Sequence, residues 1–483
     1  MSHRSILQNI AHRAMTRYGL LPEFSAAALD EARRARLVTS HDRGVRDTRG
    51  LLWASIDNDE SRDLDQLSVA ESLGGGRTKL LVAVADVDAL VPAGSACDEH
   101  ARANTTSVYT PAEVFPMLPE RFSTDLTSLQ EGEERLATVV EMTVDGEGEV
   151  AATDIYRATV LNKARLTYDA VGAWLLGEGP LPAHAAAVAG LGEVLRLQDV
   201  AAQAMRRRRH AHGALTLDTL QAHPVFDGDS ITDLRPDSRN RAKELIEDLM
   251  IAANAATAAT LERKGFAWIR RVLGVPRRWD RIVALAASFG EPLPEAPDAA
   301  ALDAFLQKRR AADPLRFPDV SLSVVKMLGS GEYAVEPPGT VPSGHFGLAV
   351  SGYTHSTAPN RRFPDLVTQR LLKAAIAGAP PPYDRERLTA LAAHCTTQED
   401  QAAKVERQVR KSAAALFLQS RIGERFQAIV TGASEKGTWV RTVGTPVEGR
   451  VVKGASGLDV GDRVDVTLVR TDVDQGFIDF ARA

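Results

Sequence analysis

The spacing of apolar residues changes twice along the chain, and the order of these changes restricts the fold more than any other feature. From residue 46 to about 160, short segments of alternating apolar and β-branched residues predict strands, among them 78–91 and 136–145. From about 185 to 290 the chain is alanine-rich with helical spacing, longest at 241–265, and a last helix is predicted at about 397–420. Because strands come first and helices later, the sequence predicts an α+β fold.

The two ends of the chain have patterns of their own. Residues 424–483 hold five short strand-like segments separated by turns, which is typical of a small closed barrel such as an OB-fold. Residues 5–37 hold two helical patterns interrupted between Gly19 and Pro22, which fits a helix-turn-helix, a winged-helix-like element or a plain helical cap. We therefore expect a helical domain at 1–45, a large domain at 46–420 and a barrel at 421–483.

Length and composition exclude several classes of protein. With 483 residues, 44% of them hydrophobic and 25% charged, the chain has the content of a multidomain globular protein. No run approaches the roughly 18 apolar residues of a membrane span, and the first residues lack the apolar core of a signal peptide, so we expect a cytoplasmic protein. Cys97 and Cys395 are the only cysteines and lie far apart, which argues against a disulfide framework or a thiolate zinc site.

Charge gives a mixed indication about nucleic acid as a partner. The net charge of −5 argues mildly against it. However, local basic segments decide phosphate binding more than the total does, and such segments occur at 206–210, 270–281 and 360–362. Taken alone, each segment is more typical of a solvated face than of a phosphate contact.

Three carboxylates gather in the segment "SIDNDESRDLDQLSV" at residues 55–69, between two strand-like runs. Asp57, Asp63 and Asp65 fit a solvated turn, because Asp and Asn bond to their own backbone in turns. They also fit a Mg²⁺ site, because Mg²⁺ prefers oxygen ligands and is often held by a few carboxylates together with substrate phosphates. The spacing does not separate these two interpretations.

The segment "HFGLAVSGYTHSTAPNRRFPDLVTQRLL" at residues 345–372 is the most specific stretch in the chain. Pro364 suits the first turn of a helix, so Arg361 and Arg362 lie just before a helix N-terminus. Backbone N–H groups and two guanidinium groups at such a place favour binding of a phosphate. The alternative is a pair of solvated arginines beside a surface helix.

This segment resembles the signature of the RNase II/RNase R exoribonucleases, and the resemblance covers about residues 50–483. The tail is similar to an S1 RNA-binding domain, through "GTWV", "VEGRVV" and "GDRVDV" in that order. The resemblance implies a central RNB-type catalytic domain and a C-terminal OB-fold (S1) barrel. It fails in the first fifty residues, where the family usually carries two cold-shock domains.

The resemblance assigns roles to the acidic stretch. Asp57, Asp63 and Asp65 match the first three of four family aspartates that hold one or two Mg²⁺ ions, and Gln66 stands at the fourth place. Asp65 and Asp63 are then catalytic, and Gln66 is a neutral ligand whose presence puts metal affinity in question. Arg361 would act on the scissile phosphate and Arg362 on a neighbouring one.

The resemblance also implies a set of substrate-binding residues. Tyr109 and Tyr168 match family aromatic residues that hold the 3′ end of RNA, and Glu247 matches an acidic partner of the substrate. Leu217 stands where an aromatic residue is usual, which weakens the stacking of roughly 1–3 kcal/mol per base. Leu273 replaces a usual histidine.

The expectation is therefore a Mg²⁺-dependent hydrolase that shortens single-stranded RNA from its 3′ end, processively, to nucleoside 5′-monophosphates. DNA is not expected as a substrate, and we expect no membrane partner and a monomer. The alternative is a catalytically weakened RNA-binding protein on the same scaffold, which Gln66 and Leu217 favour.

Overall fold

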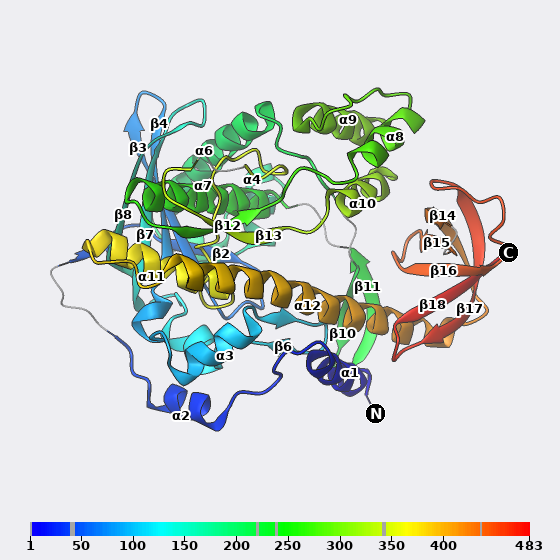
Figure 1. Ribbon diagram of the computed structural model, residues 1–483, viewed down its shortest axis with the longest axis horizontal. Coiled ribbons are helices and arrows are strands. Elements are labelled where there is room, and N and C mark those ends of the chain that lie inside the picture. Colours follow the sequence, from blue (N-terminus) through cyan, green and yellow to red (C-terminus); the bar gives the residue numbers. More distant parts are fainter. Residues whose placement is uncertain (1, 39–43, 219–221, 237–239, 341–343, 435–436) are drawn as a thin grey trace.

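The computed structural model describes residues 2–38, 44–218, 222–236, 240–340, 344–434 and 437–483. A seven-stranded sheet lies at its centre, in the order β1-β8-β7-β4-β3-β2-β9 (Figure 1). These strands are β1 (Val45–Asp47), β2 (Ala54–Asp57), β3 (Gln66–Gly74), β4 (Arg77–Ala85), β7 (Glu134–Val144), β8 (Val150–Leu161) and β9 (Ala164–Thr167). Neighbouring strands are antiparallel except at the two edges, where β1 runs parallel to β8 and β9 parallel to β2.

The central strands are covered on both faces, because β4 is buried at every position from Leu80 to Ala85. Helices α6 (Leu191–Ala211) and α7 (Arg241–Arg263) pack against the sheet, α7 along β2, β4, β7 and β8. The same core includes residues of α3 (Ala96–Asn104), α11 (Phe363–Ala377) and the first part of α12 (Arg385–Leu418). The α+β fold predicted from the order of the patterns is confirmed.

The remaining elements of the large domain surround this core. They are β5 (Val108–Tyr109), β6 (Val114–Phe115), α4 (Tyr168–Leu176), α5 (Ala183–Ala186), β10 (Ala222–Asp227), β11 (Ser230–Pro236), β12 (Trp268–Val272), α8 (Trp279–Ser288), α9 (Ala299–Ala312), α10 (Phe317–Leu328) and β13 (Glu332–Glu336). Helices α8 to α10 share a separate apolar cluster that includes Trp279, Phe305 and Phe317. Within the described ranges, no helix combines the length and the apolar character that a membrane crossing requires.

The two N-terminal helices exist where the sequence predicts them, but they do not share a core. Helix α1 (His3–Arg17) packs on α12 with Leu7 and Ile10, whereas α2 (Ala26–Arg34) packs on α3 with Ala28 and Ala32. Each helix buries its apolar face on the large domain, in line with Figure 1, where both lie along its lower edge. Of the alternatives that the sequence leaves open, a helical cap describes this packing better than a helix-turn-helix with its own core. Helical spacing does not indicate which surface an apolar face will cover.

The C-terminal strands close into a barrel in the order β14-β15-β16-β18-β17, as the tail pattern predicts. They are β14 (Arg425–Ser434), β15 (Gly437–Thr442), β16 (Glu448–Lys453), β17 (Arg463–Asp472) and β18 (Phe477–Arg482). Helix α12, which begins earlier than the predicted residue 397, runs from the large domain into the barrel core with Ala415 and Leu418 (Figure 1). Arg441 of β15 forms two bonds to Asp319 of α10, at 2.8 and 2.7 Å, and so joins the barrel to the α8–α10 region.

The barrel core has no room for a side chain at Gly449. A Cβ there would lie 2.5 Å from Cε2 of Phe480 and 2.7 Å from the carbonyl oxygen of Ile478. We expect Gly449→Ala to lower the free energy of unfolding by about 1–3 kcal/mol, because overpacking displaces core groups. Gly432→Ala is the matched control, since its Cβ would meet only Trp439 at an ordinary 3.7 Å. Thermal or urea unfolding of both variants checks this, and equal stability would contradict it.

Candidate active site

The acidic stretch is a loop between two adjacent strands of the sheet. Asp57 ends β2 and Gln66 begins β3, so the chain leaves the sheet and returns to the neighbouring strand. Asp57 Oδ1 accepts bonds from the backbone N–H of Asn58 at 2.7 Å and from Ser61 Oγ at 3.0 Å. This part of the stretch is a turn of the kind that Asp favours. The turn interpretation and the site interpretation are therefore not exclusive.

Asp65 is the most buried carboxylate of the loop, with 3% of its surface exposed. Its Oδ2 accepts a bond from Arg361 Nε at 3.0 Å, and its Oδ1 accepts one from the backbone N–H of Asn360 at 3.1 Å. Burial raises the pKa of Asp65 to about 7, the charge of Asp63 adds to this, and Arg361 opposes it. One guanidinium group therefore does not fully offset the charge of this loop.

Asp63 lies beside Asp65 and contacts a predicted substrate-binding residue. Its Oδ2 accepts a bond from the hydroxyl of Tyr109 at 3.2 Å. Burial raises the pKa of the Asp63 carboxyl and the charge of Asp57 raises it further, while Arg361 lowers it. Asp57, Asp63 and Asp65 are thus close enough to influence one another, as expected for one site.

The backbone holds Tyr109 over the acidic loop. Thr105 adopts a left-handed conformation at φ 60°, and the chain after it pairs with the segment before α11. In this pairing Phe363 N donates to Thr105 O at 2.8 Å and Ser107 N donates to Arg361 O at 3.0 Å. Glu406 of α12 accepts a bond from Tyr109 N at 2.9 Å. The ring of Tyr109 remains 42% exposed, so it is available to a ligand.

Arg361 and Arg362 lie where the sequence predicts them, immediately before α11. Arg362 is the N-cap residue, but its Nη2 bonds to Asp365 Oδ1 at 2.8 Å, while its buried Nε has no partner among the described residues. The side chain of Arg361 is bonded to Asp65 on one side and is 40% exposed. Each arginine therefore binds a carboxylate, Arg361 that of Asp65 and Arg362 that of Asp365. The exposed part of the Arg361 side chain remains accessible to a ligand.

Gln66, at the place of the fourth family aspartate, donates from its amide nitrogen to the carbonyl oxygen of Thr357. This bond ties the start of β3 to the segment before α11. The amide nitrogen is used in this bond, so the amide oxygen is the atom of Gln66 that can bind a cation. Gln66 therefore contributes a cross-link where a carboxylate would contribute charge.

The donor set at the loop suits a hard cation, since it consists of carboxylate and amide oxygens with excess negative charge. The side-chain arrangement is nevertheless incomplete: within the part of the chain that is described, no three His, Cys, Asp or Glu side chains form a ready metal-binding group. Arg361 and Tyr109 occupy oxygen atoms of Asp65 and Asp63 instead.

The other predicted substrate-binding residues fall into two groups. Tyr168 begins α4 directly after Thr167, which pairs with Asp57 across β9 and β2. Burial raises the pKa of the Tyr168 phenol and the charge of Asp57 adds to this, so the two side chains are close. Leu217 and Glu247 line a cavity of about 430 Å³, which we name the Glu247 cavity; its lining also includes Arg206, Arg209, Lys243, Gly347 and Leu348.

Two residues of the site have positions that the sequence does not predict. Asn360 contributes only a backbone N–H to Asp65, and any residue other than proline provides that group. Tyr353 accepts a bond from Asn254 Nδ2 at 3.2 Å and is influenced by the charges of both Arg362 and Glu247, so it lies between the loop and the Glu247 cavity. Tyr353 belongs to the motif at 345–372, so the sequence marks this residue but does not predict its place between the loop and the Glu247 cavity.

The basic run at 206–210 differs from the expected solvated face. Arg206 and Arg209 are only 20% and 15% exposed, and both bind the buried carboxylate of Asp248 on α7. Arg206 also bonds Glu247 at 2.9 Å. The solvated-face interpretation is wrong for these two arginines, because α6 and α7 pack side by side and bring them to the acids of α7.

Comparison with known proteins agrees with this geometry. Residues 45–378 match the family model of the RNB domain, and residues 424–483 match the RNase II-type exonuclease C-terminal S1 domain. Ribonuclease R 1 of Lactococcus lactis is 29% identical over 95% of this chain and 59% of its own length, and Ribonuclease R of Aquifex aeolicus is 32% identical over 84% and 57%. The chain thus spans less than two thirds of the length of either relative.

Among solved structures, RNase R of Mycoplasma genitalium in complex with ribose-methylated single-stranded RNA superposes with a TM-score of 0.89. The superposition covers 98% of this chain and 78% of the Mycoplasma genitalium chain. The two sequences are 23% identical, so this likeness shows the fold alone. The family model spans well over half of the chain, from β1 to the end of α11, and includes both the acidic loop and the two arginines. The chain therefore belongs to the RNB domain family, and its C-terminal barrel is an S1 domain of the RNase II type.

Proposed function

We propose that the protein is a Mg²⁺-dependent hydrolase that removes nucleoside 5′-monophosphates one at a time from the 3′ end of single-stranded RNA. The observation that carries this proposal is the buried Asp65 with its raised pKa, held beside Asp63 and against the half-exposed Arg361. Strongly perturbed carboxyl groups next to an open guanidinium group are typical of sites that act on charged substrates.

The scissile phosphate would lie between the acidic loop and Arg361. The guanidinium group of Arg361 would stabilise the negative charge that grows on the phosphate during cleavage, and Arg362 would bind a neighbouring phosphate. Tyr109 and Tyr168 flank this place, with ring faces suited to the terminal nucleotides and hydroxyls within reach of a sugar. The 2′-hydroxyl is the group through which such a site would distinguish RNA from DNA.

The terminal nucleotide would occupy the Glu247 cavity, which is concave, partly apolar and large enough for a small ligand. Glu247 can accept bonds from sugar hydroxyls or from base N–H groups. Leu217 offers an apolar surface in place of an aromatic ring, so the last base would be held less tightly than by stacking.

Asp57, Asp63, Asp65 and the amide oxygen of Gln66 would hold one or two Mg²⁺ ions, together with oxygens of the phosphate. Bound there, Mg²⁺ lowers the pKa of water and neutralises phosphate charge. The uncompensated charge of Asp63 and Asp65 supports this assignment.

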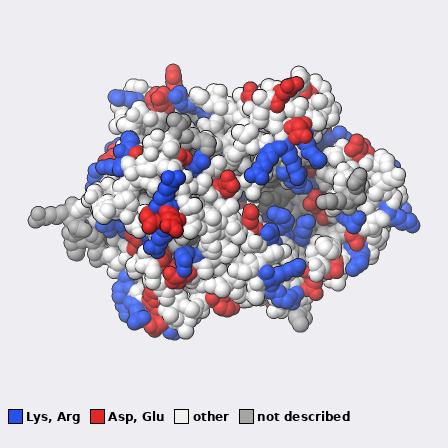
Figure 2. Space-filling model, viewed as in Figure 1, with Lys and Arg blue, Asp and Glu red and all other residues white. Residues whose placement is uncertain are grey.

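The rest of the RNA would approach through a basic recess. Figure 2 shows Lys and Arg side chains gathered around a hollow between the α8–α10 region and the barrel. Arg410 of α12, one turn beyond Glu406, has its pKa lowered by burial and by the charge of Arg407, so it lacks a full counter-charge. A polyanion would supply that charge, and its binding would weaken with salt. The S1 barrel would bind upstream nucleotides and support processive action by a monomer.

The second candidate is an RNA-binding protein with weak or absent hydrolysis. The specific observation in its favour is Gln66, whose amide bonds to Thr357 where the family has a carboxylate. In this case RNA would bind with the same salt dependence but would not be shortened.

The first test compares Asp65→Asn with Asp59→Asn, an exposed carboxylate of the same loop. A 5′-labelled RNA and its DNA counterpart are incubated with Mg²⁺ or with EDTA. Wild type and Asp59→Asn should shorten only RNA, from its 3′ end and only with Mg²⁺, whereas Asp65→Asn should be slower by roughly 100-fold or more while still binding RNA. Tight binding without shortening by wild type would establish the second candidate instead.

A second test measures how Mg²⁺ stabilises the protein at different pH. Because burial raises the pKa of Asp65 from 3.8 to about 7, the folded protein in EDTA should lose stability as the pH rises from about 4 through 7. Mg²⁺ competes with the proton, so the rise in Tm that it causes should be larger at pH 8 than at pH 6. Differential scanning calorimetry of Asp65→Asn should show a much smaller rise; an unchanged rise would mean that Mg²⁺ binds elsewhere.

A further inference from the structure

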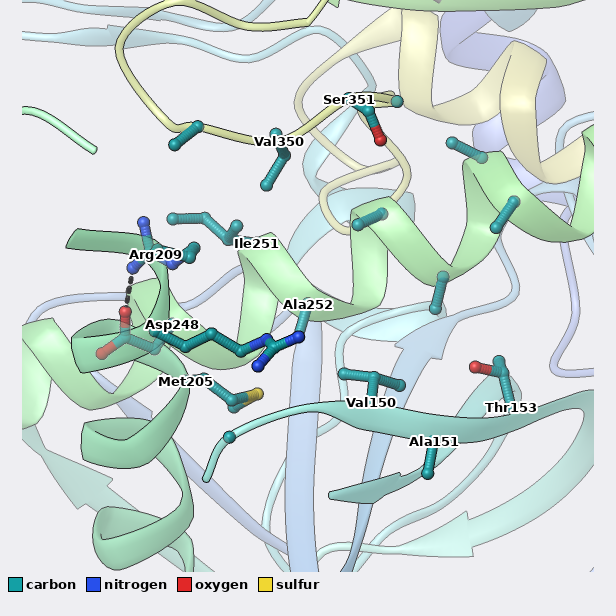
Figure 3. Close-up of a pocket in the computed structure, with 18 of the residues that line it drawn as sticks. Val150, Ala151, Thr153, Met205, Arg209, Asp248, Ile251, Ala252, Val350 and Ser351 are labelled. Carbon is teal, nitrogen blue, oxygen red and sulfur yellow. Dashed lines mark hydrogen bonds and ion pairs between the residues drawn. The ribbon is translucent and has the colours of Figure 1, made fainter. Parts of the chain in front are cut away.

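A second cavity of about 640 Å³ lies along α7 and has no role in the function proposed above. Figure 3 shows it between β8 with Val150 and Ala151, helix α7 with Ile251 and Ala252, and the segment with Val350 and Ser351. We name it the alanine cavity; its lining also includes Arg208, Arg209, Asp248, Ala255, Ala259, Glu262, Trp268 and Ala349.

The cavity exists because one face of α7 carries small side chains. Asp248, Ala252, Ala255 and Ala259 follow one another at spacings of four, three and four residues, so they lie on the same face of the helix. Larger residues at the alanine positions would fill the space. An open cavity of this size is within the range of small-molecule sites.

Two buried polar atoms belong to lining residues and lack a protein partner. Trp268 is 1% exposed, and its indole N–H has no hydrogen-bond partner among the described residues. Glu262 uses Oε1 to accept a bond from Gly339 N at 2.8 Å, but its Oε2 is buried without a partner. Both atoms are shielded from the open space of the cavity, so they lie behind its lining. Because unpaired buried polar groups are costly, a wall that contains two of them is held less tightly than a fully hydrogen-bonded wall.

The alanine cavity and the Glu247 cavity share a wall. Arg209 lines both cavities. Glu247 and Leu348 line the Glu247 cavity, whereas the residues that follow them in the chain, Asp248 and Ala349, line the alanine cavity. Figure 3 shows the Arg209–Asp248 ion pair at one end of the alanine cavity. A group that passes Arg209 would therefore move from one cavity into the other.

The shared wall has features that allow Arg209 to change partners. Asp248 also binds Arg206, at 2.9 Å, so its buried carboxylate keeps an ion pair if Arg209 turns away. In the lining of the same cavity, Ala349 adopts the left-handed conformation at φ 53°, which costs a residue with a side chain of the order of 1 kcal/mol. A strained backbone and a replaceable ion pair in the lining of one cavity favour local movement there.

We propose that the alanine cavity is an exit chamber, which receives the nucleoside 5′-monophosphate after cleavage. This rests on the proposed exonuclease function. The released nucleotide is the terminal one and lies deepest, while the shortened RNA still fills the entrance. A processive enzyme therefore needs a way out behind the terminal nucleotide. In the chamber the base lies against the alanine face of α7, and the dianionic phosphate binds Arg208 and Arg209.

The kinetic test separates product release from cleavage. Ala259→Trp fills the chamber from an exposed position of α7, and Ala393→Trp on an exposed position of α12 is the matched control. Cleavage of a single nucleotide with enzyme in excess should stay within about twofold of wild type, whereas steady-state degradation of a long RNA should fall by about tenfold or more. The control should show neither change. An unchanged steady-state rate, or an equal fall in both rates, would overturn the exit chamber.

A binding test keeps the two proposals distinguishable. Equilibrium dialysis with labelled adenosine 5′-monophosphate should give two bound equivalents for wild type, one in each cavity, and one for Ala259→Trp. Equal numbers for both proteins would refute the chamber as a nucleotide site. A wild type that cleaves no RNA would refute the proposed nuclease, and the dialysis would still decide whether the chamber binds the monophosphate.

Discussion

The ion pair between Asp65 and Arg361 joins two segments that lie 296 residues apart in the chain, and the candidate site is arranged around it. Asp65 immediately precedes β3, and Arg361 lies just before α11. The same junction holds the backbone that carries Tyr109, through the bond from Ser107 N to Arg361 O. An ion pair with one buried partner is a weak source of stability, because desolvation opposes the attraction of the charges. Its position between the start of β3 and a helix N-terminus is better explained by the chemistry of the site.

A second group of buried acids in the same domain shows what a purely structural arrangement looks like. Asp88 bonds Arg370 at 2.9 Å and Lys373 at 2.8 Å, and these two cations lower its pKa even though burial opposes them. At the acidic loop a single guanidinium group serves two interacting carboxylates, and the pKa of each is raised. The first group is electrically complete without a ligand. The second is not, and this difference is the physical basis for placing a cation and a phosphate there.

Helix α7 contributes residues to both cavities. Its acids at 247 and 248 bind the arginines of α6, and its alanine face leaves a cavity open further along the helix. The two cavities therefore depend on one pair of helices. In the proposed cycle, Arg209, which lines both cavities, would bind the phosphate of the nucleotide once it has entered the alanine cavity.

The sequence by itself determined the order of the structural classes along the chain and singled out most residues of the candidate site, although β10, β11 and β12 lie in the stretch 185–290 where helices are predicted. The change of apolar period indicated strands, then helices, then a barrel, because secondary structure follows local spacing. Asp57, Asp63, Asp65 and the arginines before α11 could be singled out because their segments are short and specific. It could not show that α1 and α2 cover different surfaces, or that Arg206 and Arg209 are buried against Asp248. Those outcomes, like the raised pKa of Asp65, arise from contacts between residues distant in the chain, and only the tertiary structure fixes burial and distance.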